Sequence, residues 1–136
     1  MSKLIDEFKK EHKIVLDAIL KLTSKEFTAK EKHKKIFELK PVLIEHLLKE
    51  NDELYGPLLD GLKNIGRLSE ECHMLSSSMV ETTNFVLGFY DDHKSLTDED
   101  KFLDDLNKFC LDLSIRIAEE ENNFFTEYEK LFDDEL

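Results

Sequence analysis

Histidines and carboxylates at helical spacing are the residues of this sequence best suited to chemistry. His46 and Glu50 are four positions apart, and Arg116 and Glu120 repeat that spacing near the other end of the chain. Residues four apart lie one turn apart on the same face of a helix, so each pair presents two polar groups together. Neutral imidazole binds first-row transition metals, and a carboxylate can bridge two of them. The pairs therefore indicate a metal site between helices.

The positions of these groups distinguish them from ordinary surface residues. Six strongly polar side chains occupy positions where the helical repeat of apolar residues calls for a core residue: His12, His46, Glu50, His73, Arg116 and Glu120. Burying a neutral polar group costs about 2–7 kcal/mol, and burying an isolated charge costs far more, unless the group is hydrogen-bonded, paired or bound to a metal. One histidine on an apolar stripe is more often a hydrogen-bonded core residue, but six groups on four helices favour a metal site. His33 and His93 lie among lysines and aspartates and are expected to be solvated.

Four helices are needed to bring these side chains together, and the apolar repeat predicts them. A first helix is expected over residues 2–22. A second begins at Thr28, because Glu31 three positions later completes a capping-box pattern. Pro41 is expected to kink or split this helix. Gly56-Pro57 is expected to end it, and residues 56–68 are expected to form an irregular connection, part of which could be a helical turn.

The second half of the chain supplies the other two helices. The third is predicted to start at Ser69, an N-cap residue, and to run to about Tyr90. The fourth opens at Thr97, with Asp100 three positions later. Four helices with short connections predict an all-α fold, an up-down-up-down antiparallel four-helix bundle that forms a single domain over residues 1–136.

Composition narrows the class of protein. The chain has 136 residues, 40% of them hydrophobic, and only four Gly and two Pro, which disfavours an all-β fold. Its net charge of −12 disfavours nucleic acid and anionic membranes as partners. No signal peptide or stretch long enough to cross a bilayer is evident, so a cytoplasmic location is expected. Cys72 and Cys110 lie in apolar helical patterns and are expected to pack as free thiols.

Taken in order, the polar segments resemble the hemerythrin-like, or histidine-histidine-glutamate cation-binding, domains over nearly the whole chain. The resemblance rests on the order and spacing of four segments, of which the one on the second helix is the most specific. These segments are Glu11–Leu16, His46–Tyr55, Glu71–Leu75, and Arg116–Glu121 followed by Phe124 and Phe125.

The resemblance implies a hemerythrin-like bundle and a non-haem iron centre. In this family two irons are ligated by histidines and bridged by two carboxylates. The metal ligands implied for this chain are His12, His46, Glu50, His73 and Glu120. His12 and His46 would bind the first iron, the two glutamates would bridge, and His73 would bind the second iron together with residue 116.

Arg116 departs from the family, which has a histidine at that place. A guanidinium has no lone pair to donate to a metal, so it is expected to pair with Glu120 or Glu50 instead. Ser77 stands where oxygen-carrying relatives have a further histidine. The resemblance therefore does not extend to reversible oxygen carriage.

Three arrangements remain open at this centre. One metal ion is held by His12, His46 and one or both bridging glutamates. Alternatively, two ions are held, with Glu119, Glu70 or water replacing the lost imidazole. In the third arrangement the guanidinium of Arg116 supplants the metal.

The function expected is a non-haem iron protein that binds or senses oxygen or another diatomic such as nitric oxide, a binding module rather than an enzyme, with no catalytic residue assigned. One alternative is a di-iron enzyme of oxidative or nitrosative stress defence. Another is a metal-free helical interaction domain with a buried ion-pair network. A ferritin-like site would need two Glu-x-x-His motifs, and the sequence has one, ending at His73.

Overall fold

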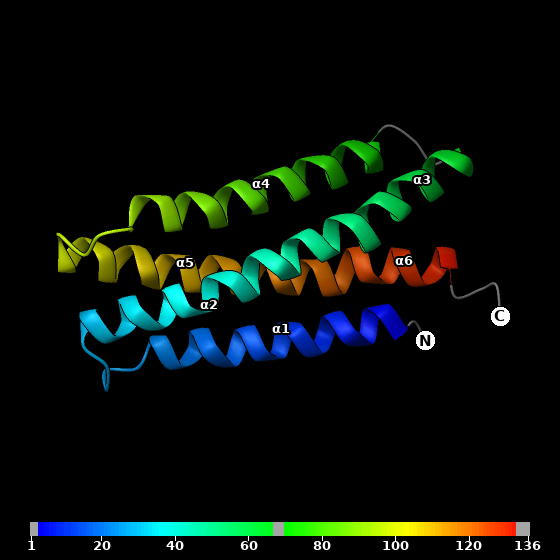
Figure 1. Ribbon diagram of the computed structural model, residues 1–136. Coiled ribbons are helices and arrows are strands. Elements are labelled where there is room, and N and C mark those ends of the chain that lie inside the picture. Colours follow the sequence, from blue (N-terminus) through cyan, green and yellow to red (C-terminus); the bar gives the residue numbers. More distant parts are fainter. Residues whose placement is uncertain (1–2, 67–69, 133–136) are drawn as a thin grey trace.

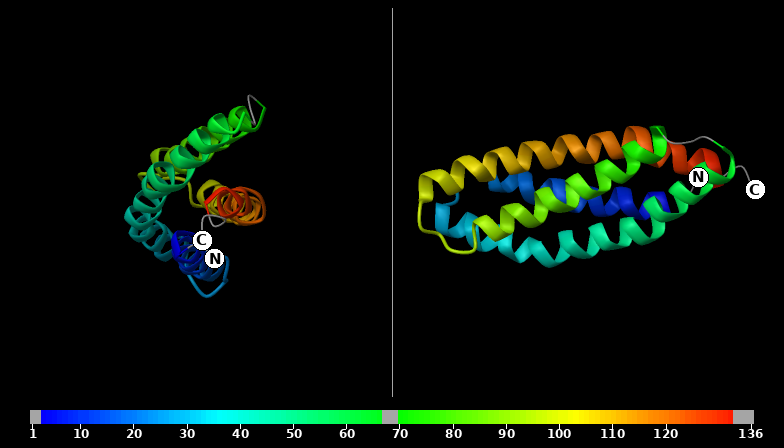
Figure 2. Two further views of the ribbon diagram at one scale, coloured as in Figure 1. Left: turned by 90° about the vertical axis from the view of Figure 1, so that its right-hand side faces the viewer. Right: turned by 90° about the horizontal axis from the view of Figure 1, so that it is seen from above.

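Every regular element of the computed structural model, which describes residues 3–66 and 70–132, is a helix. Figure 1 shows long helical rods lying alongside one another, and the end-on view in Figure 2 shows them around a common axis. The rods are α1 (Lys3–Leu22); α2 (Ala29–Glu50) with η1 (Asn51–Tyr55) and α3 (Gly56–Asn64); α4 (Glu70–Asp92); and α5 (Glu99–Glu119) with η2 (Glu120–Phe124) and α6 (Phe125–Phe132). The predicted all-helical bundle is confirmed.

The helix starts follow capping chemistry. Thr28 accepts a hydrogen bond from the backbone N–H of Glu31 at 3.2 Å, and Glu31 accepts one from the backbone N–H of Thr28 at 3.0 Å, which completes the predicted capping box. The fourth rod is capped by Asp98 rather than by Thr97, because the Asp98 carboxylate accepts from the backbone N–H of Lys101 at 3.0 Å. The predicted N-cap Ser69 lies outside the described residues.

The second rod continues where the sequence predicted its end. Helix α2 passes through Pro41, and the chain stays helical through Gly56 and Pro57. A π-helical turn, η1, joins α2 to α3, and the backbone N–H of Gly56 donates to the carbonyl of Asn51. Pro57 lies at the start of α3 and has no N–H to donate back to the preceding turn. The Gly-Pro pair therefore marks a change of helix type and not a helix end.

Two apolar clusters form the core, and the candidate site lies between them. One includes Val15, Leu43 and Ile117, and the other includes Phe8, Leu54 and Phe125. On each of these three rods the predicted polar ligands fall between the two sets of apolar residues. The packing of both clusters thus forces the ligands between them into the interior.

The described ends of the chain lie together. Helix α1 begins and helix α6 ends at the same end of the bundle (Figure 1). Among the described helices, none combines the length and apolar character that crossing a membrane requires.

Candidate metal centre

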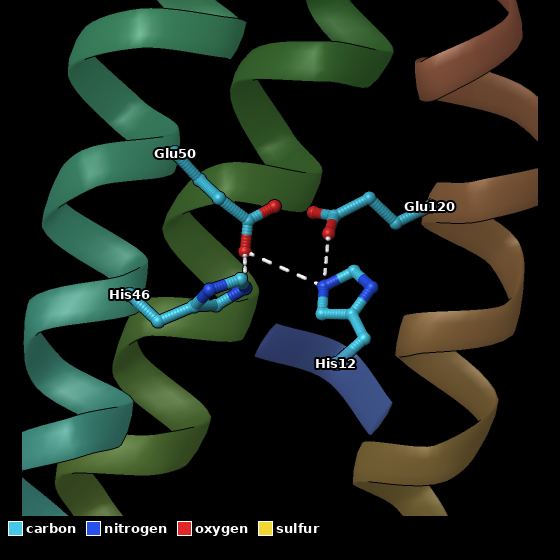
Figure 3. Close-up of side chains that lie close together, drawn as sticks. All are labelled: His12, His46, Glu50 and Glu120. Atoms are coloured by element: carbon cyan, nitrogen blue, oxygen red, sulfur yellow. Dashed lines mark ion pairs between the residues drawn. The ribbon is translucent and has the colours of Figure 1, made fainter. Parts of the chain in front are cut away.

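Four side chains from three rods converge at the middle of the bundle. His12 comes from α1, His46 and Glu50 from α2, and Glu120 from the first position of η2 (Figure 3). One ligand atom from each lies within 4.8 Å of the others. Metal–nitrogen and metal–oxygen bonds of roughly 2.0–2.2 Å place opposite ligand atoms about 4 Å apart, so this spacing suits a single ion.

Among the described residues, two buried polar atoms of this group form no hydrogen bond: Nε2 of His46 and Oε2 of Glu50. Nδ1 of His46 lies 2.7 Å from Oε1 of Glu11, so a neutral imidazole that donates there has its lone pair on Nε2. That Nε2 is in close contact with Oε1 of Glu50. Two lone pairs facing each other repel unless a proton or a cation lies between them, and a metal ion satisfies both residues.

Both histidines are supported from outside by a further carboxylate. Glu11 contacts Nδ1 of His46 at 2.7 Å, and Glu121 contacts Nδ1 of His12 at 2.8 Å. A metal-binding histidine almost always donates its other N–H to such a group, which fixes the tautomer and the ring orientation. Lys49 Nζ lies 3.1 Å from Oε2 of Glu11 and holds that carboxylate in place.

Sequence reasoning missed Glu11 and Glu121. Each is adjacent in sequence to a predicted ligand, which is the one signal that was available. Each supports a histidine on another rod: Glu11 of α1 contacts His46 of α2, and Glu121 of η2 contacts His12 of α1. Contacts of this kind are set by the packing of the rods.

When no metal is bound, protons held by His12 and Glu120 balance negative charge in the group. Burial by itself lowers the pKa of His12, but hydrogen bonds to Glu120 and Glu50 outweigh it and raise the pKa to about 10. Nε2 of His12 lies 2.9 Å from Oε1 of Glu120 and 3.7 Å from Oε1 of Glu50. Burial and the neighbouring Glu50 carboxylate raise the pKa of Glu120. A divalent cation would replace protons that the group otherwise binds.

Tyr55 is a further residue of the site that the sequence did not reveal. Its hydroxyl donates to Oε2 of Glu120. Burial and the charges of Glu120 and Glu50 raise the pKa of Tyr55, so the phenol keeps its proton and remains a donor. Tyr55 ends η1 and Glu120 begins η2, so both π-helical turns adjoin the group. Such turns occur frequently at functional sites.

His73 does not join the group. Its side chain is exposed on α4, and the buried residue nearby is Leu75, which packs with Phe8 and Phe125 in the second apolar cluster. Two positions along a helix correspond to about 200° of rotation, so burial of Leu75 turns His73 outward. The sequence placed His73 on the inner stripe of the third helix, and the structure places it on the outer face.

Arg116 also differs from its expected position. Its Nη1 donates to Oγ1 of Thr82 at 3.2 Å, and its Cζ lies 4.8 Å from the ring centroid of Phe85. The expected ion pair with Glu50 or Glu120 is not formed, because those carboxylates already contact the histidines and Tyr55.

The suggested replacement ligands lie outside the site. Glu119 and Glu70 are exposed, and neither belongs to the four-residue group. Within residues 3–66 and 70–132, no carboxylate besides Glu50 and Glu120 belongs to the group and could replace the ligand that Arg116 fails to provide.

The other two histidines and the described cysteine lie away from the four ligands and are at least half-buried. The expectation that His93 and His33 are solvated is wrong: His93 is buried with its Nε2 2.9 Å from Oδ2 of Asp105, and the half-buried His33 contacts the His93 carbonyl oxygen at 2.7 Å. Cys110 is a buried free thiol, as predicted. The Cys72 side chain lies outside the described part of the structure.

A small cavity adjoins the four ligands. Its volume is about 40 Å³, and its walls include the apolar side chains of Leu113, Ile117 and Phe124. Because one water needs roughly 10–15 Å³, the cavity has room for about three or four water-sized groups. A ligand of diatomic or triatomic size fits in this cavity, which the four ligands themselves help to line.

Comparison of the chain with models of protein families, with curated proteins and with solved structures found no match. The residues and the geometry of the site therefore carry any conclusion about function.

Proposed function

We propose that this chain is a metal-binding helical module of the hemerythrin-like kind, with an up-down-up-down antiparallel course, and that it holds non-haem iron at His12, His46, Glu50 and Glu120. The observation that carries the proposal is that two buried atoms of this four-ligand group, Nε2 of His46 and Oε2 of Glu50, form no hydrogen bond in the described part of the chain. Histidine and carboxylate together form the donor set of non-haem iron sites with open positions.

The proposal is for one ion rather than two. A second ion would need donors beyond the shared carboxylates, but His73 is exposed and Arg116 has no lone pair to offer. The four ligands that do converge already complete a set for one ion.

The ligand proposed for this centre is a diatomic such as oxygen or nitric oxide, bound or sensed in the adjoining cavity of about 40 Å³. The iron would supply an open coordination position and redox chemistry. The chain itself lines part of the cavity with the apolar side chains of Leu113, Ile117 and Phe124, and holds a proton on the Tyr55 hydroxyl next to Glu120.

One observation favours a second candidate, the metal-free interaction domain. The pairs His12–Glu120 and His46–Glu50 can balance each other when both imidazoles are protonated. A buried network of this kind is costly but can fix a unique arrangement of helices. On that alternative, a chelator leaves the melting temperature unchanged, whereas a bound metal stabilises the fold by linkage.

Metal analysis tests the proposal. Protein produced with excess iron should contain about one equivalent of iron and show charge-transfer absorption. His46→Ala should lose both, whereas His33→Ala should keep them, because His33 bonds to the His93 carbonyl away from the four ligands. Iron far below one equivalent in the unaltered protein would overturn the proposal.

A further inference from the structure

Tyr55 reaches the group of metal ligands because the helix changes type between Glu50 and Tyr55. Five positions along an α-helix correspond to about 500° of rotation, which would turn Tyr55 about 140° away from Glu50. A π-helical turn closes its hydrogen bonds one residue later, so it brings the fifth residue back towards the face where the turn started. Helix η1 fills this interval, and the backbone N–H of Gly56 donates to the carbonyl of Asn51. The π-helical turn therefore directs the phenol towards Glu120.

The two carboxylate oxygens of Glu120 have different partners. Oε1 lies 2.9 Å from Nε2 of His12, and Oε2 accepts a hydrogen bond from the Tyr55 hydroxyl. Tyr55 is only 5% exposed, and its ring meets the edge of the Phe124 ring at a centroid distance of 5.6 Å, so packing holds the hydroxyl in place. The hydroxyl thus occupies one oxygen of Glu120 and leaves the other facing His12.

A hydrogen bond to a metal-binding carboxylate changes how strongly that carboxylate stabilises each oxidation state of the metal. The donor draws negative charge away from the oxygen that faces the metal. This loss costs a trivalent ion more than a divalent ion, because Coulomb attraction grows with the charge of the ion and is screened weakly inside a protein. Hydrogen bonds around the ligands are accordingly one of the means by which proteins set the reduction potential of a metal.

The carboxylates behind the histidines act in the opposite direction. Glu11 contacts the outer nitrogen of His46, and Glu121 contacts that of His12. Such carboxylates make an imidazole a stronger donor to a metal, which favours the trivalent ion. Tyr55 instead donates to a ligand and favours the divalent ion. The two kinds of contact therefore have opposite effects on the reduction potential, and each can be altered separately.

We infer that Tyr55 is a positioning residue that raises the reduction potential of the iron centre through its hydrogen bond to Glu120. Tyr55 acts through Glu120 and is not itself assigned as a metal ligand. When the iron is reduced, it takes up one electron, and the phenol keeps its proton and its O–H bond. The inference rests on the proposed metal site and assigns control of the oxidation state of that site to Tyr55.

Anaerobic redox titration of iron-loaded protein, followed by charge-transfer absorption, tests the inference, with one-electron mediator dyes poised at an electrode as the electron source. Tyr55→Phe should favour the trivalent over the divalent ion by roughly tenfold, the lower end of what a hydrogen bond to a charged group contributes. The midpoint potential should therefore fall by about 59 mV. The matched control is Tyr90→Phe, because the buried Tyr90 hydroxyl donates to the Ile36 carbonyl at 2.8 Å in the other apolar cluster. This control should keep the midpoint potential of the unaltered protein.

Replacing Tyr55 by a fluorotyrosine keeps the ring and its hydrogen bond and tests the opposite direction. Fluorine makes the phenol a stronger donor, so the midpoint potential should rise. Iron content and melting temperature are measured for every variant, and the fluorotyrosine protein decides the question if Tyr55→Phe fails to fold or to bind iron.

The outcomes separate this inference from the proposed function. An unchanged midpoint potential in either Tyr55 variant with normal iron content, or equal shifts in Tyr55→Phe and Tyr90→Phe, overturns the role of Tyr55 alone. Failure of the unaltered protein to take up iron overturns the proposed function, and this inference with it.

Discussion

Replacing Glu11 by glutamine removes the negative charge behind His46 while keeping an oxygen that can accept its hydrogen bond. Nδ1 of His46 lies 2.7 Å from Oε1 of Glu11. Loss of a carboxylate behind a metal-binding histidine weakens metal affinity by roughly 10- to 100-fold, because the imidazole becomes a poorer donor. Glu11 is 31% exposed and lies 3.1 Å from Lys49 Nζ. Water and the lysine both reduce its influence, so we expect the lower end, about tenfold or ~1.4 kcal/mol.

Competition with a chromophoric chelator measures this loss. The matched control is Glu7→Gln, because Glu7 lies one turn earlier on α1 and approaches Lys49 at 3.7 Å without a contact to His46. The control should therefore retain the metal affinity of the unaltered protein. An equal loss in both variants would indicate a general charge effect, and no loss in Glu11→Gln would refute the idea that this carboxylate supports a metal ligand.

Three further predictions concern the fold and the stoichiometry. The pKa of His12 is raised to about 10 from an unfolded value of 6.5, so its contribution to stability is fully present below pH 6.5 and is lost as the pH rises towards 10. Urea unfolding of metal-free protein should therefore show a free energy of unfolding that declines over this pH range. The decline should be smaller in His12→Gln. Phe125→Ala should cost about 3–5 kcal/mol in urea unfolding and should also weaken metal binding, because the ring stacks on His12 at 5.3 Å; exposed Ile14→Ala should do neither. Arg116→His should leave the iron content at one equivalent, because exposed His73 cannot complete a second site; a rise to two would contradict the single-ion proposal.

The sequence predicted the all-helical bundle, but it ended the second rod too early. Apolar residues at three- and four-residue spacing determine a helix and its inner face, and Thr28 with Glu31 determines where one helix begins. His12, His46 and Glu50 interrupt apolar stripes strongly enough to be recognised as buried without reference to any neighbour. These features depend on local periodicity and on short-range hydrogen bonds, both of which are determined by residues close together in the sequence.

The tertiary structure decided which of these polar groups meet. Periodicity fixes the angle of a residue on its own helix, but the rotation of a helix against its neighbours depends on packing from all sides. Helix α4 has the weakest apolar repeat, so only packing shows that Leu75 turns inward and His73 outward. Glu11 supports a histidine on another rod, and Arg116 turns to α4 rather than to the glutamates, because both contacts cross between rods. The sequence determines which residue types are present on each helix. The packing of the four rods against one another determines which of these residues meet.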